Sequence, residues 1–190
     1  MKINSICTKQ DLIDYLNRGN HVKYLFFWGH QQQLDNAVSK SCFSQWYESP
    51  FELDNLKYLT AEHYMMAEKA RLFKDETMLS QILAATHPGE AKKFGRLVTG
   101  FKQEIWLEHR FAIVVRGNMA KFSQNPALQE FLLNTQERIL VEASPRDCIW
   151  GIGLGENNPD AQNPYKWRGK NLLGFALMKV RNRLDLKIAR

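Results

Sequence analysis

Two long charged side chains share one face of a helix that is predicted to begin after Thr60. Thr60 is a good N-cap residue, and residues 61–73 contain neither glycine nor proline. Glu62 and Lys69 stand two turns apart, about 10.5 Å along the helix axis. A carboxylate and an amine at this spacing could converge on one ligand. Periodicity alone, however, favours an ordinary solvated helix face, so both interpretations stay open.

The neighbours of this pair could stack on a ligand or form hydrogen bonds with it. His63 falls in the first turn of the helix, where the dipole disfavours a cationic imidazole, so we expect a neutral role. Met65 and Met66 are interpreted as core-filling residues. Trp28 and Trp46 offer flat surfaces suited to stacking a nucleobase, although aromatic side chains serve equally well in a core.

A second group of candidates lies at the end of an apolar strand predicted over residues 138–143. Glu142 is on the strand, Asp147 comes just beyond it, and Trp150 with Gly151 opens a glycine-rich loop. Loops that follow strands often carry sites, and glycine lets a ligand approach the backbone closely. A carboxylate buried in an apolar strand would have a raised pKa unless it is paired. An Asp-containing turn before a tight loop explains the pattern equally well.

The elements that must position these groups are mostly helical. Helices are predicted over residues 8–19, 60–73, 77–85, 88–95, 101–122 and 126–133, and from 171 onward. Short strands are predicted at 24–28 and 138–143, the latter as the central strand, and a hairpin turns at Asp54 and Asn55. The expected fold is mainly α with a few short β-strands, in a single compact domain.

Composition excludes several classes of protein. A chain of 190 residues with 44% hydrophobic residues fits one packed domain. No apolar stretch approaches the roughly 20 residues of a membrane-spanning helix. The N-terminus lacks the apolar core of a signal peptide, so a cytoplasmic location and no membrane partner are expected. Three widely spaced cysteines, without Cys/His pairs at zinc spacing, predict no disulfide framework, no metal site and no cofactor.

The net charge of +6 is confined to one end of the chain. Residues 1–166 carry 19 basic and 19 acidic residues, whereas 167–190 carry seven basic residues and one acidic residue. A uniformly basic chain would favour nucleic acid as a partner. The neutral body instead favours a small molecule, and no stable nucleic-acid complex is expected.

Taken in order, several strings in this chain resemble the NADAR family, whose members are also called YbiA-like proteins. The strings are FFWG at 26–29, CFSQWYESPF at 42–51, TAEHYMMAEKA at 60–70, KF at 121–122 with Asn125, LVEAS at 140–144, Asp147 with WGIG at 150–153, and NLLGFALM at 171–178. Residues 1–22 lie outside the resemblance. We expect them to form an N-terminal helical extension to an N-glycosidase domain of residues 23–190.

The resemblance implies a compact, mostly α-helical fold and an N-glycosidase that cleaves a ribosyl C1–N bond. The substrate would be a phosphoribosylamino-pyrimidine intermediate of riboflavin biosynthesis or, alternatively, ADP-ribose attached to guanine. A non-catalytic module that binds ADP-ribose or a nucleotide is the alternative from another class. The family often has Ser-Asn-Phe where this chain has Ser44, Gln45 and Trp46, a difference that concerns substrate choice more than the reaction.

The catalytic residues implied by the resemblance are Glu62, Lys69 and Asp147. Such a reaction develops positive charge at C1 and requires a proton for the leaving nitrogen. Glu62 and Asp147 can stabilise the charge, activate water or act as the acid. A partly desolvated Lys69 could attack C1 and pass through a Schiff base with ring-opened ribose, or could clamp a phosphate.

The remaining candidates would bind the substrate. Guanidinium groups match phosphate geometry, which makes Arg96, Arg110 and Arg116 candidates for a phosphate group, although ordinary surface arginines explain them too. The predicted substrate-binding residues are Trp28, Trp46, His63, Arg96, Arg110, Glu142, Trp150, Gly151 and Asn171.

Overall fold

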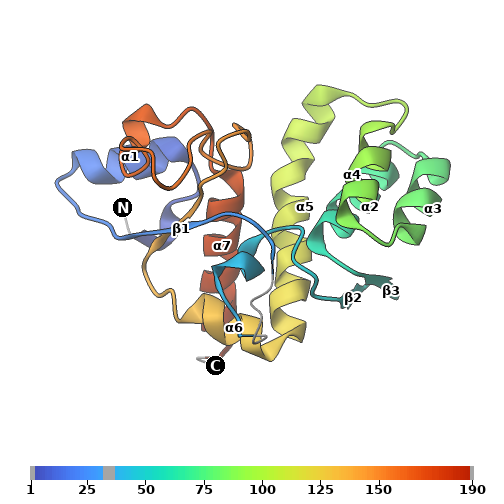
Figure 1. Ribbon diagram of the computed structural model, residues 1–190, viewed down its shortest axis with the longest axis horizontal. Coiled ribbons are helices and arrows are strands. Elements are labelled where there is room, and N and C mark those ends of the chain that lie inside the picture. Colours follow the sequence, from blue (N-terminus) through green and yellow to red (C-terminus); the bar gives the residue numbers. More distant parts are fainter. Residues whose placement is uncertain (1–2, 32–36, 189–190) are drawn as a thin grey trace. The chain divides into compact units, whose positions relative to one another are not determined.

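The computed structural model describes residues 3–31 and 37–188, and the chain forms two compact units. Residues 45–126 make up the central unit, which is continuous in sequence. Residues 1–44 and 127–190 make up the split unit, which combines an N-terminal and a C-terminal segment of the chain (Figure 1). The expectation of a mainly helical fold with a few short strands is confirmed.

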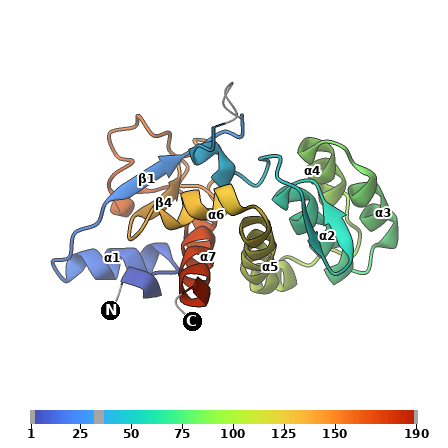
Figure 2. The same ribbon diagram turned by 90° about the horizontal axis from the view of Figure 1, so that it is seen from below.

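The central unit is organised around helix α2 (Ala61–Leu72). This helix contacts α3 (Glu76–Ala84), α4 (Pro88–Arg96) and α5 (Gln103–Gln124), as both views show (Figures 1 and 2). All seven residues from 61 to 67 are buried. The first two turns of α2 therefore have no solvated face, and for Glu62 the interpretation as a surface charge is wrong. Met65 and Met66 fill the core, as expected.

A β-hairpin precedes α2 and ends at its N-cap. Strands β2 (Phe51–Leu53) and β3 (Leu56–Tyr58) pair in antiparallel fashion. Asp54 and Asn55 both have positive φ, 54° and 60°, as a two-residue type I′ turn requires, so the predicted turn is confirmed. Thr60 then caps α2 as expected, because its side chain accepts a hydrogen bond from the His63 amide.

The split unit is built on two parallel strands and a helix. Strand β1 (Tyr24–Phe27) pairs with β4 (Ile139–Glu142), with Phe27 opposite Glu142, and α7 (Leu172–Ile188) packs on β4 (Figure 2). Among the described residues, β4 pairs with β1 alone. The expectation that this segment is a central strand is therefore wrong, because a side chain and a loop occupy its other edge.

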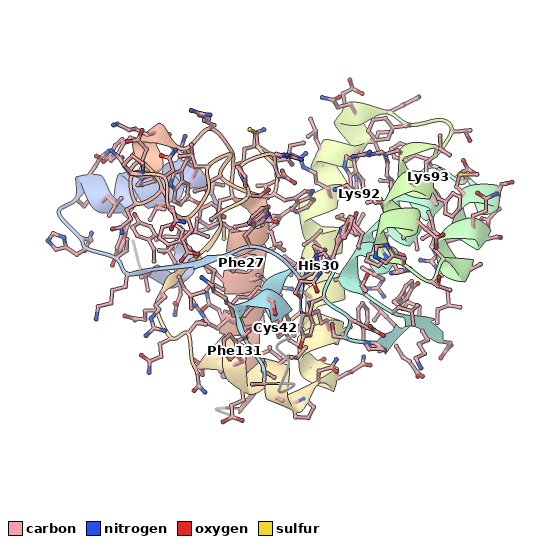
Figure 3. All side chains as sticks on the ribbon, viewed as in Figure 1. Phe27, His30, Cys42, Lys92, Lys93 and Phe131 are labelled. Carbon is pink, nitrogen blue, oxygen red and sulfur yellow. The ribbon has the colours of Figure 1, made fainter. Side chains whose placement is uncertain are left out.

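Aromatic residues from three elements fill the core of the split unit. Phe43 of η2 (Lys40–Phe43) lies with its ring centre 5.4 Å from that of Phe27 and 5.5 Å from that of Phe131. Phe131 belongs to α6 (Pro126–Leu133), and Cys42 is buried beside this cluster (Figure 3). These contacts join β1 to α6 across about a hundred residues of sequence.

The predicted N-terminal helix is present as α1 (Lys9–Asn17), with a short turn η1 (Ile3–Ser5) before it. Thr8 and Asp11 form the predicted capping box. Leu12 is fully buried, and the Lys9 ammonium donates a 2.6 Å hydrogen bond to the Trp167 carbonyl, next to η3 (Pro164–Lys166). This extension is thus packed into the split unit.

Gly174 sets how closely α7 approaches β4. A Cβ at this position would overlap the carbonyl oxygen of Leu140 and lie 2.6 Å from Nδ2 of Asn171. We therefore expect Gly174→Ala to lower the free energy of unfolding by about 1–3 kcal/mol, although alanine favours helices by up to ~1 kcal/mol. Urea denaturation measures the change.

Gly155 is the matched control, because a Cβ added there meets nothing within 4 Å. Gly155→Ala should leave the urea midpoint unchanged or raise it slightly. A Gly174→Ala protein as stable as its parent would show that the approach of helix to strand does not depend on this glycine.

Candidate active site

The predicted site residues fall into two groups, one in each unit. The central unit holds Trp46, Glu62, His63, Lys69, Arg96 and Arg110. The split unit holds Trp28, Glu142, Asp147, Trp150, Gly151 and Asn171.

Lys69 is half-buried, and its amine has a defined environment. Its Nζ donates a 2.7 Å hydrogen bond to the Gly95 carbonyl and lies 4.4 Å from the ring centre of Phe101 and 5.8 Å from that of Trp106. Burial lowers the pKa of the amine, and the positive charge of Arg96 lowers it further. Of these two causes, desolvation is the larger. The fraction of neutral, nucleophilic amine is therefore increased.

Neither Gly95 nor Phe101 was expected from the sequence to contact Lys69. The available signal was a glycine inside a helix, which calls for a packing reason. A Cβ on Gly95 would overlap the sulfur of Met66 on α2. The glycine therefore lets α4 approach α2 closely, and this approach brings the Gly95 carbonyl to the Lys69 amine.

Glu62 stands in the first turn of α2 and is 3% exposed. Its backbone N–H donates a 2.9 Å hydrogen bond to the Gln45 carbonyl, which ties the start of the helix to the preceding chain. A carboxylate in the first turn also interacts favourably with the helix dipole. Glu62 is thus a buried acid on the same helix as the Lys69 amine.

His63 has the neutral role that its position predicted. Burial lowers its pKa, so the ring is neutral, and it is 2% exposed. Its Nε2 donates to the Ala85 carbonyl at 3.2 Å, and its Nδ1 accepts from the Thr60 hydroxyl at 2.8 Å. Both ring nitrogens are therefore used within the fold: Nε2 joins α2 to the C-cap residue of α3, and Nδ1 bonds the N-cap of α2 itself.

Trp46 is half-buried and lies beside basic groups. Its ring centre is 5.9 Å from that of His87 in an edge contact, and the Lys92 ammonium is 5.6 Å from the ring (Lys92 is labelled in Figure 3). The neighbouring Gln45 turns into the core, where its Oε1 accepts from Asn118 Nδ2 at 2.8 Å. Of the two residues that differ from the usual family string, Trp46 alone is partly exposed.

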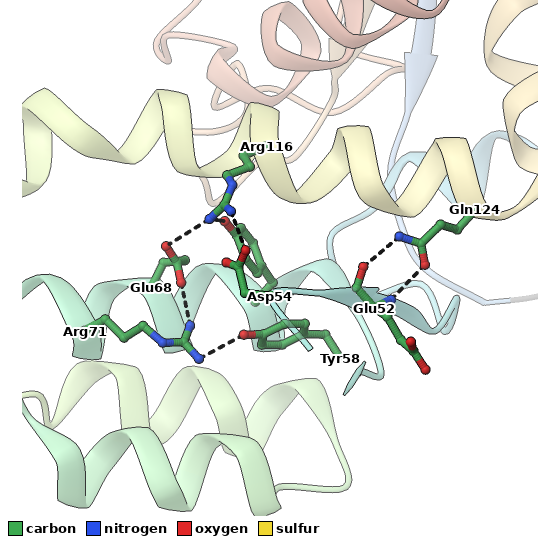
Figure 4. A network of polar contacts seen from close by, with 8 residues as sticks. Glu52, Asp54, Tyr58, Glu68, Arg71, Arg116 and Gln124 are labelled. Carbon is green, nitrogen blue, oxygen red and sulfur yellow. Dashed lines mark hydrogen bonds and ion pairs between the residues drawn. The ribbon is translucent and has the colours of Figure 1, made fainter. Parts of the chain in front are cut away.

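The three arginines considered for phosphate binding lie in different environments. Arg116 pairs with Asp54 at 2.7 Å and with Glu68 at 4.0 Å, and it donates to the Tyr64 hydroxyl at 3.3 Å (Figure 4). It thereby ties α5 to the hairpin and α2. Arg110 is buried in α5, whereas Arg96 is exposed at the end of α4.

The parallel sheet places several candidates of the split unit at one edge. Because β1 and β4 run in the same direction, Trp28 and the loop after Glu142 both leave the sheet at its C-terminal edge. Trp28 is 62% exposed and is followed by Gly29 with a φ of +84°. Parallel pairing therefore gathers an exposed indole and the end of the acid-bearing strand.

Asp147 forms the turn that was the alternative interpretation of its position. Its Oδ1 accepts 2.7 Å hydrogen bonds from the amides of both Ile149 and Trp150. Its carbonyl accepts from the Gly153 amide at 3.0 Å. This carboxylate is half-exposed and held by its own loop, so one oxygen orders the segment that carries Trp150 and Gly151.

The glycines of this loop serve close contacts between backbones. A Cβ on Gly151 would lie 2.9 Å from the Glu142 carbonyl oxygen, and one on Gly169 would overlap the Gly151 carbonyl. Gly169 donates to the Ile152 carbonyl at 2.8 Å, and Asn171 donates to the Gly151 carbonyl at 3.1 Å. Residues 147–153 therefore lie alongside 168–171, next to the end of β4.

The described residues contain no group of three or more His, Cys, Asp or Glu side chains arranged to hold a metal ion. In the same part of the chain, none of the helices is both long and apolar enough to span a bilayer.

Comparison with known proteins gives the class of protein to which this site belongs. The NADAR domain family matches residues 26–185. An N-glycosidase of Acanthamoeba polyphaga mimivirus is 43% identical over 164 residues, which is 84% of this chain and 95% of the viral protein. The N-glycosidase YbiA of Escherichia coli is 30% identical over 153 residues, covering 80% of this chain and 85% of YbiA. The protein is therefore of the N-glycosidase class.

Two further comparisons agree with this result. Protein irg-1 of Caenorhabditis elegans is 36% identical over 158 residues, covering 75% of this chain and 74% of that protein. The NMR structure of Escherichia coli YbiA superposes with a TM-score of 0.72 at 26% identity and covers 90% of each chain. The chain belongs to the NADAR domain family.

The lowered pKa of Lys69 can be tested through its two causes. Removing the positive charge in Arg96→Ala should raise the pKa of Lys69 toward its ordinary value, because a like charge disfavours the ammonium form. The desolvation effect should remain. NMR titration of ¹³C-dimethylated lysines follows the group, with the Lys69 signal assigned from a Lys69→Arg variant.

Lys93 is exposed and lies on α4, the helix that carries Arg96, so it serves as the control (Figure 3). Lys93→Ala should leave the titration of Lys69 unchanged. If Lys69 titrates with the other lysines in the parent protein, its amine is not desolvated in solution.

Proposed function

We propose that this chain is an N-glycosidase that hydrolyses the ribosyl C1–N bond of a phosphoribosylamino-pyrimidine intermediate of riboflavin biosynthesis. The observation that carries the proposal is the Lys69 amine, half-buried between aromatic rings and lowered in pKa, on the same helix as the buried acid Glu62. The N-glycosidases among its relatives support the reaction class.

In the proposed reaction, neutral Lys69 attacks C1 of the ribose. A new C1–Nζ bond forms, the C1–N bond to the base breaks, and the leaving nitrogen takes up a proton. The ring C1–O bond then opens, its oxygen is protonated, and an imine links Lys69 to C1. Water adds to the imine carbon and releases ribose phosphate and the free amine.

Carboxylates supply the remaining requirements of this chemistry. Glu62 lies on the same helix as Lys69 and is proposed to stabilise the positive charge that develops at C1 or to protonate the leaving nitrogen. Asp147 is proposed, from the resemblance, to activate the hydrolytic water through the carboxylate oxygen that does not order its loop. Each role would contribute about 10²–10⁴-fold to the rate.

Flat and basic side chains are the proposed substrate ligands. The proposed stacking residues are Trp28, Trp46 and Trp150, all of which are at least partly exposed. Arg96 is the more available phosphate ligand because it is exposed, and Arg110 is the second candidate. Glu142, Gly151 and His63 remain predicted contacts of the substrate. The balanced charge of residues 1–166 supports a small-molecule substrate and no stable nucleic-acid complex. A cytoplasmic location stays a prediction.

The first experiment compares the two substrate classes. We expect the purified protein to release ribose phosphate from the riboflavin intermediate faster than ADP-ribose from ADP-ribosylated guanosine, with both products followed by liquid chromatography. The opposite order would make the guanine conjugate the substrate.

Glu62→Gln should lose about 10²–10⁴-fold in kcat while it still binds substrate. If the parent protein and the Glu62→Gln variant both bind a nucleotide and neither turns it over, the chain is a binding module.

The covalent role of Lys69 predicts that borohydride traps the imine. Mass spectrometry of protein incubated with substrate and borohydride should show a ribose phosphate adduct on the peptide that contains Lys69. Lys69→Ala should lose both the adduct and turnover, whereas Lys93→Ala should keep both. Turnover without an adduct in the parent protein would exclude the covalent route and leave Lys69 as a phosphate clamp.

A further inference from the structure

One side chain satisfies two backbone groups at the outer edge of β4. In a β-strand, the C=O of Leu140 and the N–H of Glu142 point to the same edge, and β1 lies at the opposite one. The Asn171 amide satisfies both groups: its Nδ2 donates to Leu140 O at 2.9 Å, and its Oδ1 accepts from Glu142 N at 2.9 Å. The carboxamide takes the place of a peptide group in a third strand.

Asn171 is itself fixed in this position. It is 0% exposed, and its φ of +54° is a conformation that asparagine tolerates better than most residues. Its N–H donates to the Gly151 carbonyl and its own carbonyl accepts from the Phe175 amide, at 3.1 and 3.2 Å. Gly174 packs against the amide and leaves no room for a Cβ.

These contacts fix the backbone of Glu142 on both sides of its Cα. The N–H is held by Asn171, and the carbonyl accepts from the Ile152 amide at 3.0 Å. The next residue, Ala143, donates to the Phe27 carbonyl at 2.9 Å. With both flanking peptide groups held, the direction of the Glu142 Cα–Cβ bond is fixed as well.

We propose that Asn171 is a positioning residue that acts through Glu142 rather than a residue that touches the substrate. Its amide holds the end of β4, and its backbone N–H holds the loop that carries Trp150 and Gly151. The role in catalysis rests on the proposed function, in which Glu142 contacts the substrate.

A double-mutant cycle tests this dependence. Asn171→Gly removes the amide and is compatible with the positive φ. We expect it to lower kcat/KM about tenfold in the parent protein and less than about twofold in a Glu142→Gln background, because coupled residues are not additive. The same fold-loss in both backgrounds would show that Asn171 acts independently of Glu142 and would overturn the proposal.

Amide hydrogen exchange gives a readout that needs no turnover. The Glu142 N–H should be protected in the parent and should exchange faster in Asn171→Gly. Asn163→Gly, in the segment between β4 and α7, is the control. The Asn163 side chain bonds the Tyr165 amide and not the Glu142 amide. Asn163→Gly should change neither the Glu142 exchange nor kcat/KM. Unchanged Glu142 exchange in Asn171→Gly would also overturn the proposal.

A conservative variant covers the case in which Asn171→Gly does not fold. Asn171→Asp keeps the acceptor for the Glu142 N–H but sets a carboxylate oxygen against the Leu140 carbonyl. We expect partial protection of the Glu142 amide and an intermediate kcat/KM, and no loss of either would overturn the proposal. A parent protein without turnover would disprove the proposed function alone, since exchange still reports whether Asn171 holds Glu142.

Discussion

Desolvation of α2 is the constraint on which the chemistry proposed for this protein depends. The first seven residues of the helix are buried, yet they include an acid, and the half-buried Lys69 comes two residues after them. Taking an amine out of water disfavours its charged form, which lowers the pKa of Lys69 and makes its neutral form more available. A helix on the surface with the same sequence would carry an ordinary ammonium group. The burial of the helix thus favours the neutral amine that the proposed nucleophilic role of Lys69 requires.

Glycines at close contacts achieve the packing in both units. In the central unit, Gly95 lets α4 reach Met66 on α2, and Gly117 leaves room for the Tyr64 ring. In the split unit, Gly174 lets α7 reach Leu140, and Gly169 lies against the Gly151 carbonyl. At each of these positions a methyl group would displace an element that carries or supports a candidate residue. Backbone carbonyls and side-chain amides can then hold the functional groups directly.

Local features of the sequence predicted the elements well. The capping residues Thr8 and Thr60, the turn at Asp54 and Asn55, and Pro126 at the start of α6 act over a few residues, and the structure has them as expected. The role of β4 was not predictable in this way. An apolar run suggests a central strand, whereas here its outer edge is closed by Asn171, which is 29 residues away from Glu142 in sequence.

The sequence by itself determined the helices, the hairpin, the family resemblance and the acid and amine on α2, because these depend on residue type and short spacing. The tertiary structure alone decided what surrounds them. Phe101, Trp106 and the Gly95 carbonyl meet at Lys69, both nitrogens of His63 are used within the fold, and the Asn171 amide closes a strand. Apart from the contact between His63 and Thr60, these contacts join segments tens of residues apart. They are set by how helices and loops pack, which spacing along the chain does not encode.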